Sequence, residues 1–405
     1  MQKFVLKLLS AILALQAALS ASAQTDPNSD SAIANASLPN GTITSVVGNG
    51  YSGTIGIGGP AAAAQLVGPG NVVFDKHGNL FISDFYLEQI FEVSASTGKI
   101  TVFAGTGGGG YSGDGGPATK ATFHNPQQLA FGPDGSLYIA DSNNNAIRRV
   151  DAKTGIISTV AGNGVGAGPS PADVCGKLIL GRKATKTAIC NPLGIAFDRA
   201  GNLYIDSIGN ILKVDASTDI VSNVAGNGSY GYTGDGGPAI DAELSWVGGI
   251  AVGPTGNIFI ADSGNCAIRK VNVKTGIITS LVGVPLHPWQ GTCGLTGLGG
   301  PASAASIRSP FGIYVDAGGN VFFSDNGDHM VDVIAVKDGK LYQVAGSYTG
   351  TNGNGGFSGD GGPSIDATLY NPDGITLDSS GNLYIADQSN GAIRKVTKPA
   401  AAYIP

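Results

Sequence analysis

Gly135-Ser136-Leu137-Tyr138-Ile139-Ala140-Asp141 contains the short strand motif that decides the fold of this 405-residue chain. A Gly-Asn or Gly-Ser turn, three large apolar residues and a nearby aspartate recur six times, with 55 to 66 residues from one copy to the next. The apolar triplets are Leu80-Phe81-Ile82, Leu137-Tyr138-Ile139, Leu203-Tyr204-Ile205, Ile258-Phe259-Ile260, Val321-Phe322-Phe323 and Leu383-Tyr384-Ile385. Such a repeat indicates units that bury their faces by stacking on their neighbours.

The second repeat predicts four short strands, at residues 129–131, 137–140, 146–150 and 156–160. They are separated by Gly, Asn and Asp residues, which tolerate the backbone conformations of tight turns. Apolar residues occupy both faces of the strands, as expected for sheets enclosed between two neighbours. We therefore predict an all-β protein, a six-bladed β-propeller with four antiparallel strands in each blade.

The two ends of the repeat region indicate how the ring closes. Residues 374–396 supply only three strands of the last unit, while residues 41–50 match residues 155–164 almost position for position. The N-terminal strand is therefore predicted to complete the last blade, which leaves no open sheet edge. Five blades with an unrelated N-terminal strand is the alternative.

The termini predict an exported chain. Residues 1–23 have two lysines, an apolar run and the small-residue box Ala21-Ser22-Ala23, the pattern of a cleaved signal peptide. Residues 24–40 are expected to be a flexible leader, 41–397 the propeller and 398–405 a tail. The apolar run is too short to span a bilayer, and no later stretch is long enough. We expect a secreted or periplasmic monomer.

The charge balance excludes one class of partner. Without residues 1–23 the chain has 21 basic and 29 acidic residues, a net charge of −8. Binding of nucleic acid needs a basic face that neutralises phosphates, so no nucleic-acid partner is expected.

The repeat units resemble NHL repeats. The resemblance is carried by Leu193-Gly194-Ile195-Ala196-Phe197-Asp198 followed by Gly201-Asn202-Leu203-Tyr204-Ile205, and it extends over residues 41–397. It implies the propeller fold. It does not imply one function, because NHL propellers include protein-binding, RNA-binding and catalytic members.

Four cysteines in an exported chain predict two disulfides. Cys175 and Cys190 bracket one insertion, and Cys266 and Cys293 flank the fourth repeat and the loop that follows it. Three pairings are open, and we favour Cys175–Cys190 and Cys266–Cys293.

The loops between repeats share a Gly-Asp-Gly-Gly-Pro signature that contains Asp114, Asp235 and Asp360. These aspartates are candidate ligands of a calcium ion, because hard cations bind several oxygens on flexible loops. The related segments at 56–60 and 297–301 keep the glycines and the proline but hold Ile57 and Leu298 in place of the acid. This favours a structural turn, with no cofactor expected and calcium as the alternative.

A second signature joins an aspartate, an asparagine and an arginine: Asp141, Asn144 and Arg148; Asp262, Asn265 and Arg269; Asp387, Asn390 and Arg394. An arginine on the third strand is expected to reach the carboxylate of the preceding turn, which makes a structural latch. The first, third and fifth repeats break the pattern; the fifth has Asp325, Asp328 and Asp332.

The start of the innermost strands is the expected ligand face. The aligned positions there hold Asn71, Gln128 and four glycines, and two residues further on they hold apolar or small residues and Tyr314. Metal-dependent or acid–base catalysis needs titratable groups that converge, and these positions supply none. The predicted ligand-binding residues are Asn71, Gln127, Gln128, Asp373, Trp246 and Tyr314, with Tyr111 and Tyr232 as further aromatics at the border.

Amides bordered by aromatic rings suit a carbohydrate or a peptide backbone. The sequence therefore favours an exported, non-catalytic binding scaffold that recognises a protein or a carbohydrate through its loop face. The alternative is a metal-dependent hydrolase or lyase with ligands from the interblade loops, such as His124, His287 and His329 with Asp114 or Asp360.

Overall fold

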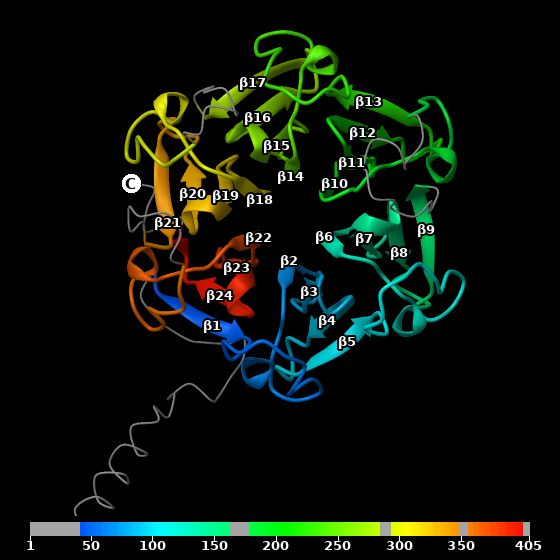
Figure 1. Cartoon of the computed structure of the whole chain (residues 1–405), viewed down its shortest axis with the longest axis vertical. Coiled ribbons are helices and arrows are strands. Elements are labelled where there is room, and N and C mark those ends of the chain that lie inside the picture. The colour runs from blue at the N-terminus through cyan, green and yellow to red at the C-terminus, as the bar shows by residue number, and fades with distance from the viewer. Residues whose placement is uncertain (1–40, 163–177, 284–292, 348–354, 400–405) are drawn as a thin grey trace, which may run out of the picture.

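Six small sheets surround a central axis in the computed structural model of the chain, which describes residues 41–162, 178–283, 293–347 and 355–399. Each sheet has four antiparallel strands, and the sheets are arranged as the blades of a propeller (Figure 1). The predicted all-β, six-bladed fold is confirmed.

Each blade runs outward from an innermost strand that lies beside the axis. Blade one consists of β2 (Pro69–Phe74), β3 (Leu80–Asp84), β4 (Gln89–Val93) and β5 (Ile100–Ala104). Blade two consists of β6 (Pro126–Phe131), β7 (Leu137–Asp141), β8 (Ala146–Val150) and β9 (Ile157–Gly162). Blade three consists of β10 (Ile195–Phe197), β11 (Leu203–Ser207), β12 (Asn210–Val214) and β13 (Val221–Ala225).

The other three blades repeat this order. Blade four consists of β14 (Val247–Val252), β15 (Ile258–Asp262), β16 (Ala267–Asn272) and β17 (Ile277–Val282). Blade five consists of β18 (Pro310–Val315), β19 (Val321–Asp325), β20 (Met330–Ile334) and β21 (Leu341–Ala345). Blade six consists of β22 (Pro372–Leu377), β23 (Leu383–Asp387), β24 (Ala392–Val396) and β1 (Ile43–Val47).

The outer strand of blade six comes from the other end of the described chain. β1 pairs antiparallel with β24, and Ile43 lies opposite Val396 (Figure 1). This pairing confirms the predicted closure of the ring, and it gives the outer edge of β24 the same partner strand that the other blades have.

Short 3-10 helices mark two kinds of connection. One kind lies in the segments that lead into each blade: η1 (Ala61–Ala63), η2 (Ala118–Lys120), η4 (Ala184–Lys186), η5 (Ala239–Asp241), η8 (Ala302–Ala304) and η10 (Ser364–Asp366). The other kind follows the second strand: η3 (Ser142–Asn144), η6 (Ser263–Asn265), η9 (Asn326–Asp328) and η11 (Gln388–Asn390). The second kind ends at a residue in the left-handed conformation, where asparagine and glycine fit best.

The hydrophobic core lies between the blades. Six clusters of buried residues are found in the described part of the chain, one at each blade junction. At the junction of blades one and two, Phe81 and Ile90 pack with Leu129 and Ile157. Both faces of a middle strand are therefore buried, as the sequence predicts, and neighbouring blades stabilise one another through apolar burial.

The third strand of every blade has an irregularity at the same level. The pairing of third and fourth strands shifts register between Ile147 and Arg148, and at the corresponding residues of the other five blades. This shared register makes Phe91, Arg148, Leu212, Arg269, Asp332 and Arg394 structurally equivalent.

Candidate functional site

The ring has two faces with different loops. The innermost strands begin on one of them, here called the strand-start face, which also carries the turns between second and third strands. They end on the opposite face, here called the strand-end face. The predicted residues Asn71, Gln127, Gln128, Asp373 and Trp246 all lie at or near the strand-start face.

The predicted amides connect the innermost strands to one another. Asn71 Oδ1 accepts a hydrogen bond of 3.1 Å from the N–H of Leu129 in blade two. Gln128 reaches two blades, because its Oε1 accepts from the N–H of Ile195 at 2.8 Å and its Nε2 donates to the carbonyl of Ile250 at 3.3 Å. Asn71 and Gln128 therefore bind the strands of the channel wall to one another.

The glycines of the channel wall allow the same strands to approach closely. A Cβ at Gly312 would lie 2.3 Å from the carbonyl oxygen of Asp373 in the next blade. A Cβ at Gly374 would lie 2.8 Å from the carbonyl oxygen of Gly70. These positions need glycine for backbone contact between blades, so Asn71 and Gln128 supply the side chains at this level of the wall.

The other predicted channel residues are largely buried. Asp373 is 8% exposed, and burial raises its pKa well above the usual range. Tyr314 packs against the cluster between blades five and six, and burial raises its pKa. Gln127 Nε2 donates to Asn125 Oδ1 at 2.7 Å.

The aspartates of the Gly-Asp-Gly-Gly-Pro loops are ion-paired with buried arginines. Asp114 Oδ1 accepts from Arg148 Nη2 at 2.7 Å, and its Oδ2 accepts from the N–H of Thr159 at 3.0 Å. Asp235 and Asp360 bind Arg269 and Arg394 in the same way, both at 2.6 Å. Within the described ranges, no three His, Cys, Asp or Glu side chains are gathered so that they could hold a metal ion.

Each of these arginines also reaches the turn aspartate, as the second signature predicts. Arg148 Nη1 donates to Asp141 Oδ2 at 3.1 Å, and Asn144 donates to the same carboxylate. We call this arrangement the arginine latch: Arg148, Asp141, Asn144 and Asp114 in blade two, and their equivalents in blades four and six. The side chains of Arg148 and Asp141 are fully buried, and the latch ties an interblade loop to a blade.

Two aromatic residues expected at the border of the ligand face belong to the latches. The guanidinium of Arg148 lies 4.9 Å from the ring centre of Tyr111, and that of Arg269 lies 4.9 Å from Tyr232. The hydroxyl group of Tyr111 shares a hydrogen bond with Thr159 at 2.7 Å. Cation–π contact with the guanidinium thus holds these rings at the latch, and their role at the border of a ligand site stays a prediction.

The histidines proposed for a hydrolase have separate surroundings where they are described. His124 precedes β6 and donates its backbone N–H to Asp141 Oδ1 at 2.8 Å. His329 ends η9, and its Nδ1 accepts from the N–H of Asn371 at 3.1 Å. Burial lowers the pKa of His329. His287 lies outside the described residues.

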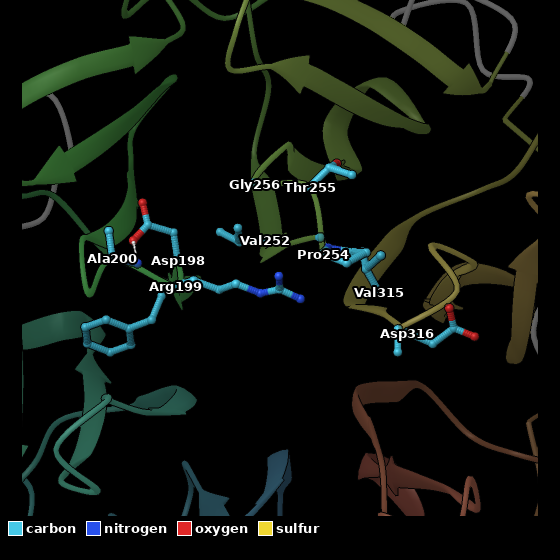
Figure 2. A pocket seen from close by; sticks show the side chains of 12 residues that line it. Asp198, Arg199, Ala200, Val252, Pro254, Thr255, Gly256, Val315 and Asp316 are labelled. Carbon is cyan, nitrogen blue, oxygen red and sulfur yellow. Dashed lines mark hydrogen bonds between the residues drawn. The ribbon is translucent and has the colours of Figure 1, made fainter.

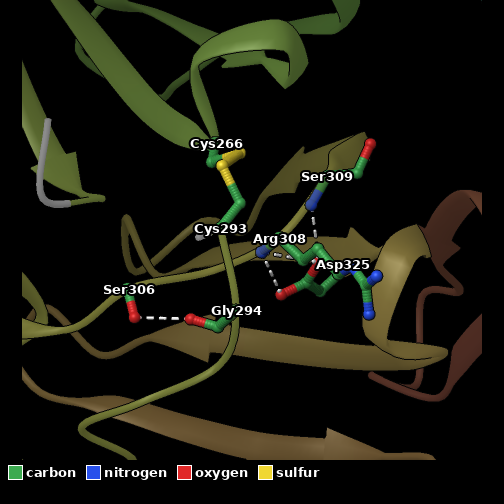
Figure 3. The surroundings of a disulfide bond; sticks show 7 residues. All are labelled: Cys266, Cys293, Gly294, Ser306, Arg308, Ser309 and Asp325. Carbon is green, nitrogen blue, oxygen red and sulfur yellow. Dashed lines mark hydrogen bonds between the residues drawn. A yellow bond between two sulfur atoms is a disulfide. The ribbon is translucent and has the colours of Figure 1, made fainter. Parts of the chain in front are cut away.

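One predicted disulfide is confirmed. Cys266, in the second turn of blade four, is bonded to Cys293, in the loop that leads to blade five (Figure 3). Cys175 lies outside the described residues, so its pairing with Cys190 stays a prediction.

A small recess on the strand-start face combines aromatic and polar residues at the junction of blades three and four. It has a volume of about 60 Å³, and its lining includes Asn191, Asp206, Ser207, Tyr230 and Trp246. Trp246 is 63% exposed and Tyr230 58% exposed. The sequence prediction named Trp246 but missed the other four residues, which come from three separate segments of the sequence.

The carboxyl group in this recess is neutral. Asp206 accepts from the N–H groups of Leu193 at 2.7 Å and Gly194 at 2.6 Å. Burial nevertheless raises its pKa to about 8, because these backbone hydrogen bonds do not offset the loss of solvation. The recess thus offers hydrogen-bonding groups and two aromatic rings without a full negative charge at pH 7.

A larger opening lies at the strand-end face, between blades three, four and five. It measures about 480 Å³, and Figure 2 shows Arg199 extending from blade three toward the middle of the ring. Asp198 and Asp316 also line it, and its one aromatic ring, Phe197, packs edge-on against Tyr138 at 4.7 Å. Sequence reasoning placed the ligand at the other face and missed this opening.

These features define the class of protein: a closed six-bladed β-propeller with a surface recess that carries exposed aromatic side chains. Comparison with known proteins supports the predicted family within this class. The chain is 26% identical to NHL repeat-containing protein 2 of Gallus gallus, over 82% of this chain and 46% of that protein. The relatives and the six-bladed ring together place the chain among the NHL-repeat propellers. No protein-family model matches the chain.

Other similar proteins are much longer. SUPPRESSOR OF QUENCHING 1 of Arabidopsis thaliana is 27% identical over 83% of this chain and 31% of its own length. Human Teneurin-1 is 26% identical over 89% of this chain and 13% of its own length. The chain thus spans less than half the length of these curated relatives.

Solved structures show the same fold at lower identity. An auxiliary nutrient binding protein from Bacteroides ovatus superposes with a TM-score of 0.61 at 17% identity, covering 87% of this chain and 76% of its own. A putative phosphatase from Bacteroides thetaiotaomicron superposes with a TM-score of 0.58 at 13% identity, covering 88% of this chain and 78% of its own.

Among the described residues, no helix has the length and apolar character that a membrane crossing requires.

Proposed function

We propose that this protein is an exported, non-catalytic binding scaffold that takes a carbohydrate in the recess between blades three and four. The ligand would lie on the strand-start face, against the exposed rings of Trp246 and Tyr230. A protein partner that binds the same surface is the competing outcome.

The observation that carries the proposal is the backbone of Trp246. Its φ angle is +49°, in the left-handed region, and the equivalent residues of three other blades are Asn125, Asn191 and Asn371, with φ between +44° and +60°. Asparagine tolerates this conformation and a bulky residue does not. Trp246 is also exposed, so burial of its ring does not compensate for the strain. A strained residue with an exposed side chain is typical of a functional site.

The chemistry of the recess suits a neutral sugar. Tryptophan and tyrosine rings present an apolar face with a polar edge, which fits the C–H face of a pyranose and the hydroxyl groups around it. Asn191 and Ser207 supply amide and hydroxyl groups at the same place. Because Asp206 is neutral at pH 7, the recess does not require a charged ligand.

Two further observations support export and binding. The disulfide between Cys266 and Cys293 is typical of proteins outside the reducing cytosol, and residues 1–23 have the pattern of a signal peptide. Solved structures with this fold include proteins named as auxiliary nutrient binding proteins.

The experiment uses the two tryptophans of the chain, Trp246 and Trp289. In a Trp289→Phe variant, Trp246 is the only indole that reports on binding. Titration with a panel of neutral oligosaccharides is expected to change its fluorescence with at least one of them. Trp246→Asn and Tyr230→Ala should each weaken that binding by ten-fold or more in calorimetry.

The matched control is Tyr51→Ala, which removes another exposed aromatic ring and should leave the affinity unchanged. Failure of every oligosaccharide in the panel to bind, together with a peptide-library hit that Trp246→Asn abolishes, would replace the carbohydrate with a protein ligand. Binding that survives Trp246→Asn and Tyr230→Ala would overturn the location.

A further inference from the structure

Blade five replaces the buried arginine of the latch with an aspartate. Asp332 pairs with Phe323 on β19 as Arg148 pairs with Ile139 on β7, so the two residues occupy the same register. The register shift with the fourth strand also falls at the same place, between Val331 and Asp332. A carboxylate therefore stands where blades two, four and six hold a guanidinium.

The latch arginines donate to backbone carbonyls at fixed distances along the chain. Arg148 Nη2 donates to the carbonyl 36 residues earlier, that of Ser112, and its Nη1 to the carbonyl 26 residues earlier, that of Thr122. Arg269 and Arg394 make the same two contacts at the same separations. In blade five, the residues 36 and 26 positions before Asp332 are Thr296 and Ser306. Their carbonyl groups receive no hydrogen bond from an arginine among the described residues, because Asp332 stands at the arginine position of this blade.

The other two partners of the latch differ as well. Asn144 donates both to Asp141 and to the carbonyl of Gly110, and its equivalent in blade five is Asp328, which has no N–H to donate. The equivalent of Asp114 is Leu298. Blade five thus loses all the side-chain donors of the latch and gains two carboxylates.

The new carboxylates are buried, and three of their four oxygens lack a hydrogen-bond partner among the described residues. Asp332 is 0% exposed, and neither of its carboxylate oxygens has a hydrogen-bond partner in the part of the chain that the structure describes. The same holds for Oδ2 of Asp328, which is 8% exposed. Burial and the charges of Asp325 and Asp328 raise the pKa of Asp332 well above its usual range.

The nearby cation, Arg308, contacts only one of these two carboxylates. Arg308 Nη1 lies 3.6 Å from Asp328 Oδ1, and its side chain is 37% exposed. Asp325 is the equivalent of Asp141, and it accepts from the backbone N–H groups of Arg308 and Ser309 (Figure 3). A buried carboxylate without a partner is costly, and proteins resolve such a case with a cation or a proton.

We propose that blade five binds a calcium ion at the position that the guanidinium occupies in blades two, four and six. Asp332 and Asp328 supply the carboxylate ligands, and the carbonyl groups of Thr296 and Ser306 supply neutral oxygens. Calcium takes six to eight oxygen ligands in flexible geometry, from carboxylates, backbone carbonyls and water. Two carboxylates suffice for this arrangement, so it does not require a cluster of three acidic side chains.

The loop that frames this position is anchored to the neighbouring blade. The disulfide joins Cys293 of this loop to Cys266 of blade four (Figure 3). The next residue, Gly294, accepts a hydrogen bond from the hydroxyl group of Ser306 through its carbonyl oxygen. Thr296 and Ser306 are themselves joined by backbone hydrogen bonds of 3.1 and 3.3 Å. Each proposed carbonyl ligand thus already accepts one backbone N–H and keeps a second lone pair for the ion. The same bonds order the backbone before an ion arrives, which lowers the ordering cost of binding.

The test compares thermal stability in calcium and in chelator. The full chain is dialysed against EDTA and then against buffer with or without calcium chloride. The melting temperature of the wild type is expected to rise by about 3 to 6 °C with calcium at roughly a hundred times its dissociation constant. Calorimetry should give about one ion per chain. Magnesium at the same concentration should have a much smaller effect, because it demands octahedral geometry.

Two variants distinguish the ion from a protonated carboxyl group. Asp332→Asn removes a buried charge, so it should melt above the wild type in EDTA and should not respond to calcium. The pair Leu298→Asp with Asp332→Arg rebuilds the latch of the other blades and should fold without any calcium response. The control Asp366→Asn, at an exposed acid of blade six, should keep the full response.

Three outcomes contradict the proposal. A wild type that melts at the same temperature in calcium and EDTA, with no heat of binding, means that Asp332 is simply protonated. A calcium response that survives Asp332→Asn means that the ion binds elsewhere on the chain. A response to calcium that is lost equally in Asp366→Asn means a general effect of charge. None of these outcomes bears on the carbohydrate site, which shares no residue with blade five.

Discussion

Blades two and five have the same backbone at the latch position and opposite charges there. In blade two the guanidinium of Arg148 is fully buried between Asp141 and Asp114, with ion pairs of 3.1 and 2.7 Å. In blade five Asp332 is equally buried, and its surroundings hold Leu298 in place of the loop aspartate. The fold therefore does not require an arginine at this position.

Blade one shows a third solution. Phe91 occupies the latch position and Ile57 the loop position, and both belong to the apolar cluster between blades six and one. Its turn aspartate, Asp84, accepts instead from the backbone N–H groups of Val67, Gly68 and Leu87. The latch and loop positions thus hold two opposite charges in blade two and two apolar side chains in blade one. In blade five they hold a carboxylate, Asp332, and an apolar side chain, Leu298. This mismatch points to an additional ligand.

The largest expected effect is the loss of a latch arginine. Arg148→Met keeps the length of the side chain and removes the charge, which leaves Asp141 buried without its cation. We expect unfolding free energy to fall by about 3–5 kcal/mol, measured by denaturant unfolding followed by circular dichroism.

The neighbouring arginine is the matched control. Arg149 is 25% exposed and pairs with Asp134 and Asp151 at the surface, so Arg149→Met should cost no more than about 1 kcal/mol. Equal losses for Arg148→Met and Arg149→Met would show that the latch has no special role in stability.

The second effect is a dependence on pH that comes from blade three. Asp206 stands at the position that Ala140 has in blade two, one residue before the equivalent of Asp141, and burial raises its pKa to about 8. The raised value follows from burial, because the backbone N–H groups of Leu193 and Gly194 that bind this carboxyl group do not offset the cost of burying its charge. The folded protein then retains a proton on Asp206 that the unfolded chain releases near pH 4.

Stability should therefore fall as the pH rises from about 4 to 8, because the folded state binds more protons over this range. One group contributes a slope of about 1.4 kcal/mol per pH unit. Asp206→Asn removes this group, so the slope of unfolding free energy against pH should become shallower by that amount. An unchanged slope would mean that Asp206 is ionised in the folded protein.

The sequence was sufficient for the architecture because each blade repeats the same local pattern. Six apolar triplets give the number of blades, and the match between residues 41–50 and 155–164 predicts that β1 pairs in blade six. The latch was also predictable, because Arg148 follows Asp141 at the same spacing in three blades. Local spacing within a repeat is preserved in the fold, so it can be read from the chain.

The candidate site was harder to predict because it depends on contacts between repeats. Gln128 was predicted as a ligand-binding residue, but its hydrogen bonds to Ile195 and Ile250 join three blades and cannot be read from one unit. The recess gathers Asn191, Tyr230 and Trp246 from different loops. One signal was available: when the repeats are aligned, Trp246 occupies the position that Asn125, Asn191 and Asn371 have in other blades.

A smaller effect is expected when the pair of blade one is moved into blade two. Asp114→Ile with Arg148→Phe replaces the ion pair with the apolar pair that blade one uses. Buried ion pairs can often be replaced by packed apolar residues at little net cost. The double variant removes Asp114 together with Arg148, and Asp141 keeps its hydrogen bonds from His124 and Asn144, so the loss should be smaller than that of Arg148→Met, about 1–2 kcal/mol. A loss equal to that of Arg148→Met would show that Asp141 needs its arginine even when the volume is filled.

The smallest effect has the opposite sign and concerns the recess. Trp246→Asn gives blade four the residue that three other blades have at this position, and asparagine adopts the left-handed conformation with little strain. Since the ring of Trp246 is mostly exposed, little apolar burial is lost, and unfolding free energy should rise by about 0.5–1 kcal/mol. The control Asn371→Trp makes the reverse change in blade six and should lower stability by a similar amount. If Trp246→Asn instead destabilised the protein by more than about 1 kcal/mol, the indole would be a packing residue, and the case for a ligand at this recess would lose its main support.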